Sequence, residues 1–142
     1  MDIRKLEIGD LDRLCAVEEG LFDAPVTRGR ARAFLSDPGH AICAAFDEAV
    51  MVAFASGTVL RHPDKAPSLF INEVGTRDSH LRQGLGTAVS TALMDWARSE
   101  GITEIWLATE TDNRPARALY RSMGGDEGVF ALYAWGFRWD GD

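Results

Sequence analysis

The sequence predicts an α/β fold, in which helices pack on both faces of a β-sheet. Apolar runs typical of strands alternate along the chain with stretches whose apolar residues recur at helical spacing. Hydrophobic residues make up 46% of the 142 residues, which is enough to bury one core. Because no repeat, low-complexity tract or linker interrupts the sequence, we expect one domain over residues 1–142. The expected order of elements is β-α-α-β-β-β-α-β-α-β.

The N-terminal part of the chain predicts a strand followed by two helices. Residues 2–7 (DIRKLE) form the strand. Asp10 can cap the first helix and Thr27 the second, because their side-chain oxygens can accept hydrogen bonds from N-terminal helix amides. The turn SDPG at residues 36–39 ends the second helix. The apolar residues on one side of the first helix are Leu11, Leu14, Cys15, Leu21 and Phe22.

The middle of the chain predicts three strands. Residues 40–46 and 49–60 form two of them, joined by a tight polar turn at Asp47 and Glu48. A polar loop at residues 61–68 leads into the third strand, residues 69–74 (LFINEV).

The C-terminal part predicts a helix, a strand, a shorter helix and a last strand. The first helix starts at residue 85 and ends at Gly101. Residues 102–109 form the strand, residues 113–125 the shorter helix, and residues 129–137 the last strand. We expect three tryptophans to be core or edge-covering groups rather than a binding box: Trp106, Trp135 and Trp139.

Composition limits the classes of function. The net charge of −7 leaves no basic stripe, which argues against nucleic-acid binding. No 18-residue apolar run and no signal peptide are present, so we expect a cytoplasmic protein without a membrane partner. Cys15 and Cys43 are interpreted as core thiols in a reducing compartment. The histidines show no metal-ligand spacing, so we expect no metal.

The stretch SHLRQGLGTAV, residues 79–89, places two glycines at the start of a helix. Gly84 and Gly86 lack a Cβ atom, so an anion such as pyrophosphate can approach the free helix amides. A tight loop without a ligand is the alternative. Two nucleotide-binding loops are excluded, because Val89 stands at the third position of a dinucleotide fingerprint and no lysine follows either glycine.

Two segments together resemble the signature motifs of the GCN5-related N-acetyltransferase (GNAT) superfamily. Residues 82–97 (RQGLGTAVSTALMDWA) resemble the acetyl-coenzyme A loop, Q/R-x-x-G-x-G/A. Residues 102–125 (ITEIWLATETDNRPARALYRSMGG) resemble N-x-x-A-x-x-L-Y-x-x-x-G. The positions that match the second motif are Asn113, Ala116, Leu119, Tyr120 and Gly124.

The resemblance covers roughly residues 40–137 and implies a particular sheet. That sheet is mixed and mostly antiparallel, with a splayed pair of parallel strands and helices on both faces. Within the superfamily, residues 69–88 look most like the aminoglycoside 3-N-acetyltransferase branch and its uncharacterised bacterial relatives.

The resemblance also implies where acetyl-coenzyme A (acetyl-CoA) binds. Its pantetheine would follow the splayed strand at Val74 and Thr76, and main-chain N–H groups near Val74 could polarise the thioester carbonyl. Asn113 and Ala116 are further expected cofactor contacts, and Asn113 can also cap its helix. The residues expected around the pyrophosphate are Arg82, Gln83, Gly84, Leu85, Gly86 and Thr87.

Four side chains are candidates for chemistry or substrate binding. Glu73 could act as general base through water, or be an ordinary outward-facing acid. The resemblance implies that Tyr120 donates a hydrogen bond to the departing coenzyme A sulfur, and a core tyrosine is the alternative. Glu110 and Asp112 could bind a cationic substrate, or be solvated loop acids.

These residues predict a bacterial-type N-acetyltransferase that transfers the acetyl group of acetyl-CoA to a primary amine by direct attack. The acceptor is a small cationic amine, such as an aminoglycoside, or a peptide amine. A non-catalytic acyl-CoA sensor or partner-binding module on the same fold is the alternative.

Three departures from the family pattern bear on this choice. Leu81 replaces the usual Arg or Gln of the loop, and Gly125 replaces an aromatic residue. The tail after Gly125 fits one strand where the family fold has two. Either the last strand is absent, or the partner in a homodimer covers the open edge.

Overall fold

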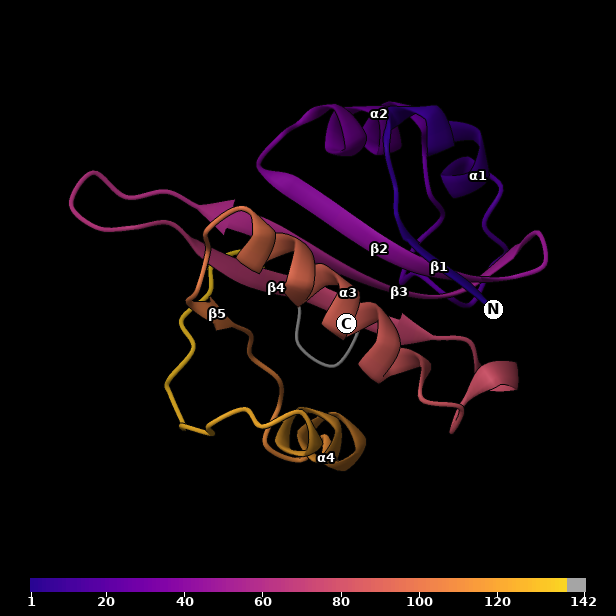
Figure 1. Cartoon of the computed structure of the whole chain (residues 1–142). Coiled ribbons are helices and arrows are strands. Elements are labelled where there is room, and N and C mark those ends of the chain that lie inside the picture. The colour runs from indigo at the N-terminus through magenta and orange to yellow at the C-terminus, as the bar shows by residue number, and fades with distance from the viewer. Residues whose placement is uncertain (138–142) are drawn as a thin grey trace. The chain divides into compact units, whose positions relative to one another are not determined.

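The computed structural model describes residues 1–137, and the chain divides into two compact units, Met1–Ala108 and Thr109–Asp142. The first unit holds a β-sheet with helices on both of its faces (Figure 1). The second unit holds helix α4 and the segment that follows it. Trp139 lies outside the described residues. No helix of the described part is long and apolar enough to cross a membrane.

The sheet has five strands in the order β1-β2-β3-β4-β5. The pairs β1–β2, β2–β3 and β3–β4 are antiparallel, whereas β4–β5 is parallel. This arrangement confirms the predicted mixed, mostly antiparallel sheet. The strands are β1 (Asp2–Lys5), β2 (His40–Asp47), β3 (Val50–Leu60), β4 (Ser68–Thr76) and β5 (Ile105–Trp106).

Side chains of β2 alternate between two apolar clusters, because successive residues of a strand point to opposite faces. Cys43 and its like-facing neighbours pack with helix α3 (Leu85–Ser99), which covers one face. Ile42 and its like-facing neighbours pack with α1 (Leu11–Cys15) and α2 (Arg28–Ser36), which cover the other. Both faces of the sheet are therefore buried, as the sequence predicts.

Helix α3 buries one side at a spacing of four residues. Leu85, Val89, Leu93 and Ala97 are each at most 6% exposed. Burying a Leu or Val side chain stabilises a fold by about 1.5–3 kcal/mol, so this stripe alone holds α3 firmly on the sheet. Gly101, which has a φ of 82°, follows the helix end and confirms the predicted stop.

The first predicted helix is too long by several residues. Helix α1 ends at Cys15, and Leu21 and Phe22 lie in an irregular segment. Gly20 has a φ of 98°, a left-handed conformation that a right-handed helix cannot continue through. Asp10 is the N-cap residue of α1 as predicted, but its side chain makes no capping hydrogen bond to α1, because its carboxylate accepts a hydrogen bond from the Glu7 amide instead, at 2.8 Å. That contact belongs to a short 3-10 helix, η1 (Ile8–Asp10).

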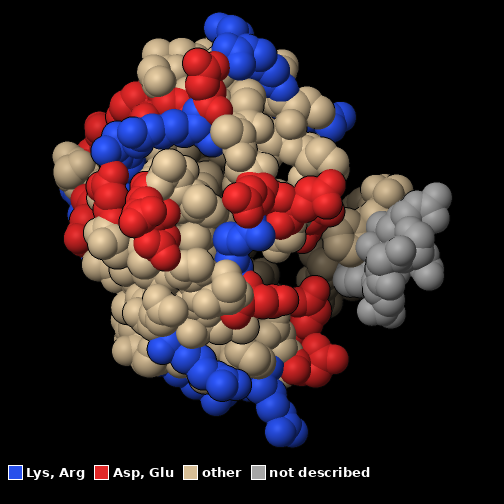
Figure 2. Space-filling model, turned by 90° about the vertical axis from the view of Figure 1, so that its right-hand side faces the viewer, with Lys and Arg blue, Asp and Glu red and all other residues tan. Residues whose placement is uncertain are grey.

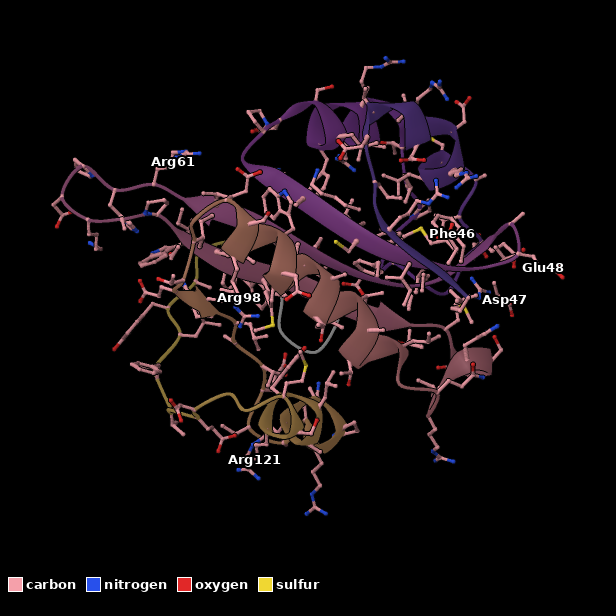
Figure 3. All side chains as sticks on the ribbon, viewed as in Figure 1. Phe46, Asp47, Glu48, Arg61, Arg98 and Arg121 are labelled. Carbon is pink, nitrogen blue, oxygen red and sulfur yellow. The ribbon has the colours of Figure 1, made fainter. Side chains whose placement is uncertain are left out.

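Two other local predictions are confirmed. Thr27 caps α2, with its hydroxyl accepting a hydrogen bond from the Arg30 amide at 3.4 Å. Asp47 pairs with Val50 across the tight β2–β3 turn. Figure 3 shows Asp47 and Glu48 at the tip of this hairpin, whereas Arg61 lies towards the other end of the sheet.

The second unit is built on α4 (Arg114–Ser122). Asn113 caps the helix as predicted, with its side-chain oxygen accepting a hydrogen bond from the Ala116 amide at 3.2 Å. Arg117 and Arg121 both bind the carboxylate of Glu127, at 2.8 and 2.7 Å. These ion pairs fix the start of the tail beside its own helix.

The last two predicted strands require correction. The strand predicted over residues 102–109 is reduced to Ile105–Trp106, because only Leu69 and Phe70 of β4 pair with it. Residues 129–137 form no strand, and the apolar side chains of the tail are exposed, with Phe130 at 91%. A strand needs a backbone partner, and the apolar run that predicted one carries no information about whether that partner exists.

Candidate functional site

A β-bulge in β4 determines which side chains reach the candidate site. Ser56 of β3 pairs with Glu73, but Gly57 pairs with Ile71, so Asn72 is an extra residue in β4. Ile71, before the bulge, packs in the cluster under α3. A regular strand would place Glu73 on that same face. The bulge turns Glu73 to the opposite face, where α1 and α2 lie.

A pocket of about 370 Å³ opens on that face, within the first unit. Its floor includes Ile42, Ser56 and Glu73, which are neighbours across three adjacent strands. Its walls come from α2 and from the irregular segment that precedes α2. The lining residues used below are Phe22, Asp23, Arg30, Phe34, Asn72 and Glu73.

Glu73 carries an unbalanced charge at this pocket. Its carboxylate makes no hydrogen bond or ion pair with the described residues. Partial burial, and secondly the negative charge of Asp23, raise the pKa of Glu73 above its usual value. A carboxylate with a raised pKa is a better proton acceptor than an ordinary surface acid, and it also attracts a cation.

The edge of β4 beyond the bulge has free backbone groups. The Arg77 amide donates to the Val52 carbonyl, at 2.9 Å. Backbone groups alternate in direction along an antiparallel strand, so those of Val74 and Thr76 point away from β3. On that side β5 pairs only with Leu69 and Phe70, which leaves Val74 and Thr76 on an open edge of the first unit. This is the predicted splay between two parallel strands.

The loop before α3 has an unusual backbone. Arg82 and Gly84 have φ values of 63° and 75°, and Gly84 is the N-cap residue. The amides of Leu85, Gly86 and Thr87 come before the first helical hydrogen bond, which runs from the Ala88 amide to the Gly84 carbonyl.

The surroundings of this loop leave room for an anion. A Cβ atom at Gly84 would meet no atom within 4 Å. The Arg82 guanidinium makes no ion pair or hydrogen bond with the described residues. Leu81 is 52% exposed, so an apolar side chain borders the loop. The positive end of the α3 dipole and a free guanidinium together suit a phosphate group.

A short network holds the segment that leads into this loop. His80 Nε2 lies 2.8 Å from an Asp47 carboxylate oxygen, and His80 Nδ1 lies 2.7 Å from the Ser79 hydroxyl. The 3-10 helix η2 (Asp78–His80) is thereby tied to the β2–β3 turn. Arg77 contributes a second tie, donating to the Glu18 carbonyl at 3.2 Å.

The remaining predicted site residues belong to the second unit. Tyr120 is half-buried on α4, and burial raises the pKa of its hydroxyl. Asn113 and Ala116 form the first turn of α4 through the capping hydrogen bond. Glu110 and Asp112 are exposed in the loop before the helix.

Sequence reasoning missed most of the pocket. The sequence predicts Phe22 on the first helix, whereas Phe22 and Asp23 lie in the irregular segment before α2. Arg30 and Phe34 show only ordinary helical spacing. Acidic side chains form several patches on the face in Figure 2, with basic side chains among them, so an exposed acid does not by itself indicate a site. Among the described residues, no three His, Cys, Asp or Glu side chains gather as a metal site would need.

Comparison with known proteins gives a family match over most of the chain. A model of the acetyltransferase (GNAT) family matches residues 7–124. The [ribosomal protein bS18]-alanine N-acetyltransferase of Escherichia coli K12 is 36% identical over 77 residues, which are 54% of this chain and 49% of that protein. The chain spans less than half the length of the curated relatives it matches.

Two solved structures resemble the chain over nearly its whole length. One is an aminoglycoside acetyltransferase from an uncultured soil metagenomic sample, in complex with sisomicin. Its TM-score is 0.79 at 21% identity, covering 94% of this chain and 95% of that one. The other is AAC(6')-Iy in complex with the bisubstrate analogue CoA-S-monomethyl-acetylneamine. Its TM-score is 0.79 at 17% identity, covering 96% of this chain and 98% of that one. At these identities the likeness shows the fold.

Proposed function

We propose a function for this chain from one premise: it belongs to the acetyltransferase (GNAT) family. The chain transfers the acetyl group of acetyl-CoA to a primary amine, either of a small molecule or of a peptide. A relative named for acetylating a ribosomal-protein alanine and a structural neighbour named for aminoglycosides support this class of reaction. The second name makes an aminoglycoside-like amine one acceptor to be tested.

One observation carries the proposal: three suitable features follow one another within residues 73–87. Glu73 lines an acid-bearing pocket. Val74 and Thr76 have free backbone groups on the open edge of β4. The first amides of α3 and the free Arg82 guanidinium come next. The acidic pocket suits the acceptor amine, the open strand edge suits the pantetheine of acetyl-CoA, and the start of α3 suits its pyrophosphate.

The fit to acetyl-CoA follows from donor and acceptor chemistry. The free N–H and C=O groups of Val74 and Thr76 can hydrogen-bond the amides of a pantetheine as a neighbouring strand would. Gly84, with open space at its Cβ position, lets a pyrophosphate approach the amides of Leu85, Gly86 and Thr87. Arg82 and Gln83 lie beside it. Asn113 and Ala116 are proposed as further contacts.

Acetyl-CoA supplies a thioester, whose carbonyl carbon is the electrophile. Glu73 accepts a proton from the acceptor ammonium through water, which frees the nitrogen lone pair for attack on that carbon. A backbone N–H near Val74 stabilises the oxyanion that forms. The carbon–sulfur bond then breaks, and Tyr120 donates a hydrogen bond to the departing thiolate, which takes its proton from solvent. The amide nitrogen loses its second proton to solvent.

The test measures acetyl-CoA binding and amine-dependent release of free thiol. Acetyl-CoA should raise the melting temperature, and an acceptor amine should release thiol above background hydrolysis while forming one N-acetyl product. Tyr120→Phe should lower turnover and retain binding. Binding without thiol release for any amine would favour an acyl-CoA sensor, and no binding at all would reject both functions.

The rest of the proposal concerns the setting of the protein, its assembly and its secondary contacts with the acceptor. We place its reaction in the cytoplasm of a bacterium and assign the acetyltransferase function to one domain over residues 1–142. A homodimer is also proposed, in which the partner copy covers the sheet edge left open where residues 1–137 lack the family's last strand. Glu110 and Asp112 are proposed as secondary contacts for a cationic acceptor.

A further inference from the structure

The lining of the pocket at Glu73 carries information about the acceptor. Most of the side chains around it are apolar, among them Phe22, Phe34 and Ile42. The Phe22 ring stacks on Phe54, with centroids 4.2 Å apart, and the Phe34 ring lies against His40 at 5.1 Å. These contacts hold the aromatic walls in place, so the pocket offers a preformed apolar surface.

The charges in the pocket are few. Asp23 and Glu73 are its acids, and neither makes an ion pair with the described residues. Arg30 also lines the pocket, and its guanidinium likewise has no partner among the described residues. One ammonium placed between the two acids would be well balanced. A second ammonium would meet either the apolar walls or the free positive charge of Arg30.

The size of the pocket points the same way. Its volume of about 370 Å³ lies near the lower end of the usual range for ligand sites, about 300–1,000 Å³. A sugar-based polycation needs a hydrogen-bond partner for each buried hydroxyl and ammonium. Apart from the three charged groups, the polar side chains here are Thr27, Ser56 and Asn72. Two of them are already engaged: Thr27 caps α2, and the Asn72 oxygen accepts a hydrogen bond from the Thr58 hydroxyl at 3.0 Å. These groups are too few for a polycation.

We propose that the acceptor is a primary monoamine with an apolar body of aromatic or branched-aliphatic size, held by the walls of Phe22 and Phe34 with its nitrogen at Asp23 and Glu73. This inference rests on the proposed acetyl transfer and specifies its second substrate. Acetyl transfer itself proceeds as described above: the nitrogen–carbon bond forms and the carbon–sulfur bond breaks. The acceptor ammonium loses two protons and the departing thiolate takes up one, so each turnover releases one proton.

The decisive comparison uses two amines that differ at one end. Hexylamine and hexamethylenediamine have the same carbon chain, but the diamine replaces the terminal methyl group with an ammonium. With the full chain and acetyl-CoA, kcat/KM for hexylamine should exceed that for the diamine about tenfold or more, because the far end must enter an apolar pocket. Phenethylamine should be used well, and spermidine and kanamycin poorly.

Two variants test the reason for this preference. Arg30→Gln should raise kcat/KM for hexamethylenediamine about two- to fivefold more than it raises kcat/KM for hexylamine, because it removes one positive charge from a partly solvated site that the diamine enters with two ammonium groups. Arg28→Gln is the matched control: Arg28 lies on the same helix, pairs with Asp12 at 2.9 Å and does not line the pocket. It should change neither amine. Phe34→Ala should lower kcat/KM for hexylamine about tenfold, and it should lower kcat/KM for hexamethylenediamine by a smaller factor.

The outcomes separate this inference from the proposed function. If kanamycin, spermidine or the diamine has the higher kcat/KM, acetyl transfer stands and the monoamine assignment is overturned. If Arg30→Gln and Arg28→Gln have the same effect, the charge argument fails. If no amine releases thiol although acetyl-CoA binds, the proposed function fails and the acceptor assignment fails with it. If Phe34→Ala does not fold, the comparison of Arg30→Gln with Arg28→Gln and the comparison of the two amines still test the monoamine assignment, because both arginines are exposed.

Discussion

Replacing Gly84 with alanine should weaken acetyl-CoA binding far more than it weakens the fold. Gly84 has a φ of 75° and caps α3 where the pyrophosphate is proposed to approach. A Cβ atom there meets no atom of residues 1–137 within 4 Å, so the new methyl group would occupy only the space proposed for the ligand. Gly101 offers a matched control at the other end of α3, with a φ of 82° and equally open space.

The cost to stability should be the same for both variants. A left-handed backbone costs a non-glycine residue about 1–2 kcal/mol, and alanine recovers about 0.4–1 kcal/mol by restricting the unfolded chain. The net loss is therefore about 1 kcal/mol for Gly84→Ala and for Gly101→Ala. In a chain of this length that corresponds to a melting temperature lower by about 2–6 °C.

The effect on binding should separate the two variants. Hydrogen bonds to a charged group are worth about 1.5–3 kcal/mol, so losing one amide contact to pyrophosphate should raise Kd about tenfold or more. At a ligand concentration about 100 times the original Kd, acetyl-CoA stabilises the protein by about 2.7 kcal/mol. A tenfold weaker Kd reduces this to about 1.4 kcal/mol.

The assay is thermal unfolding with and without acetyl-CoA, supported by calorimetric titration. Gly101→Ala should show the full ligand-induced shift in melting temperature, and Gly84→Ala about half of it. Equal ligand-induced shifts in the two variants would show that the amides of Leu85, Gly86 and Thr87 do not carry the pyrophosphate. The reasoning about the α3 N-terminus would then be wrong.

Three further predictions concern single side chains. The raised pKa of Glu73 should place the acid limb of the profile of kcat/KM against pH above the usual carboxylate range. Asp23→Asn should move that limb to lower pH, because it removes a like charge beside Glu73. A limb that does not move would contradict this cause. Ser90→Ala should raise the free energy of unfolding by about 0.5–1.5 kcal/mol and thus raise the melting temperature, because the buried Ser90 hydroxyl on α3 has no hydrogen-bond partner among the described residues. A lower melting temperature would show that this hydroxyl makes a hydrogen bond. Burial raises the pKa of the Cys43 thiol to about 11, so iodoacetamide should label the half-buried Cys15 before Cys43. Mass spectrometry of the native protein after short labelling times measures this order, and early labelling of Cys43 would contradict its burial.

Sequence reasoning succeeded where a residue's environment repeats along the chain. The apolar run over residues 40–46 predicted a strand, and the helical spacing of Leu85, Val89 and Leu93 predicted α3. The caps at Thr27 and Asn113 follow from local chemistry, which a short window of sequence contains. Each of these features depends on neighbours within a few residues.

Sequence reasoning failed where a feature depends on a distant partner. Residues 129–137 have strand-like composition, yet the Arg117–Glu127 and Arg121–Glu127 ion pairs hold the start of this tail beside α4. The pocket likewise joins Asp23 to Glu73, which lie fifty positions apart in the sequence. Nothing in either local sequence indicates that the two carboxylates line one cavity.

The bulge at Asn72 explains why the candidate site is on β4 and not elsewhere in the sheet. A regular strand would place Glu73 under α3, among Leu69 and Ile71, where an unpaired carboxylate would be costly. The extra residue instead aims Glu73 at the pocket, and the pairing with β5 ends just before it, at Phe70. The same irregularity therefore accompanies both the proposed base and the open edge at Val74. An alternating pattern cannot reveal it, because a bulge shifts the alternation by one residue and leaves the composition unchanged.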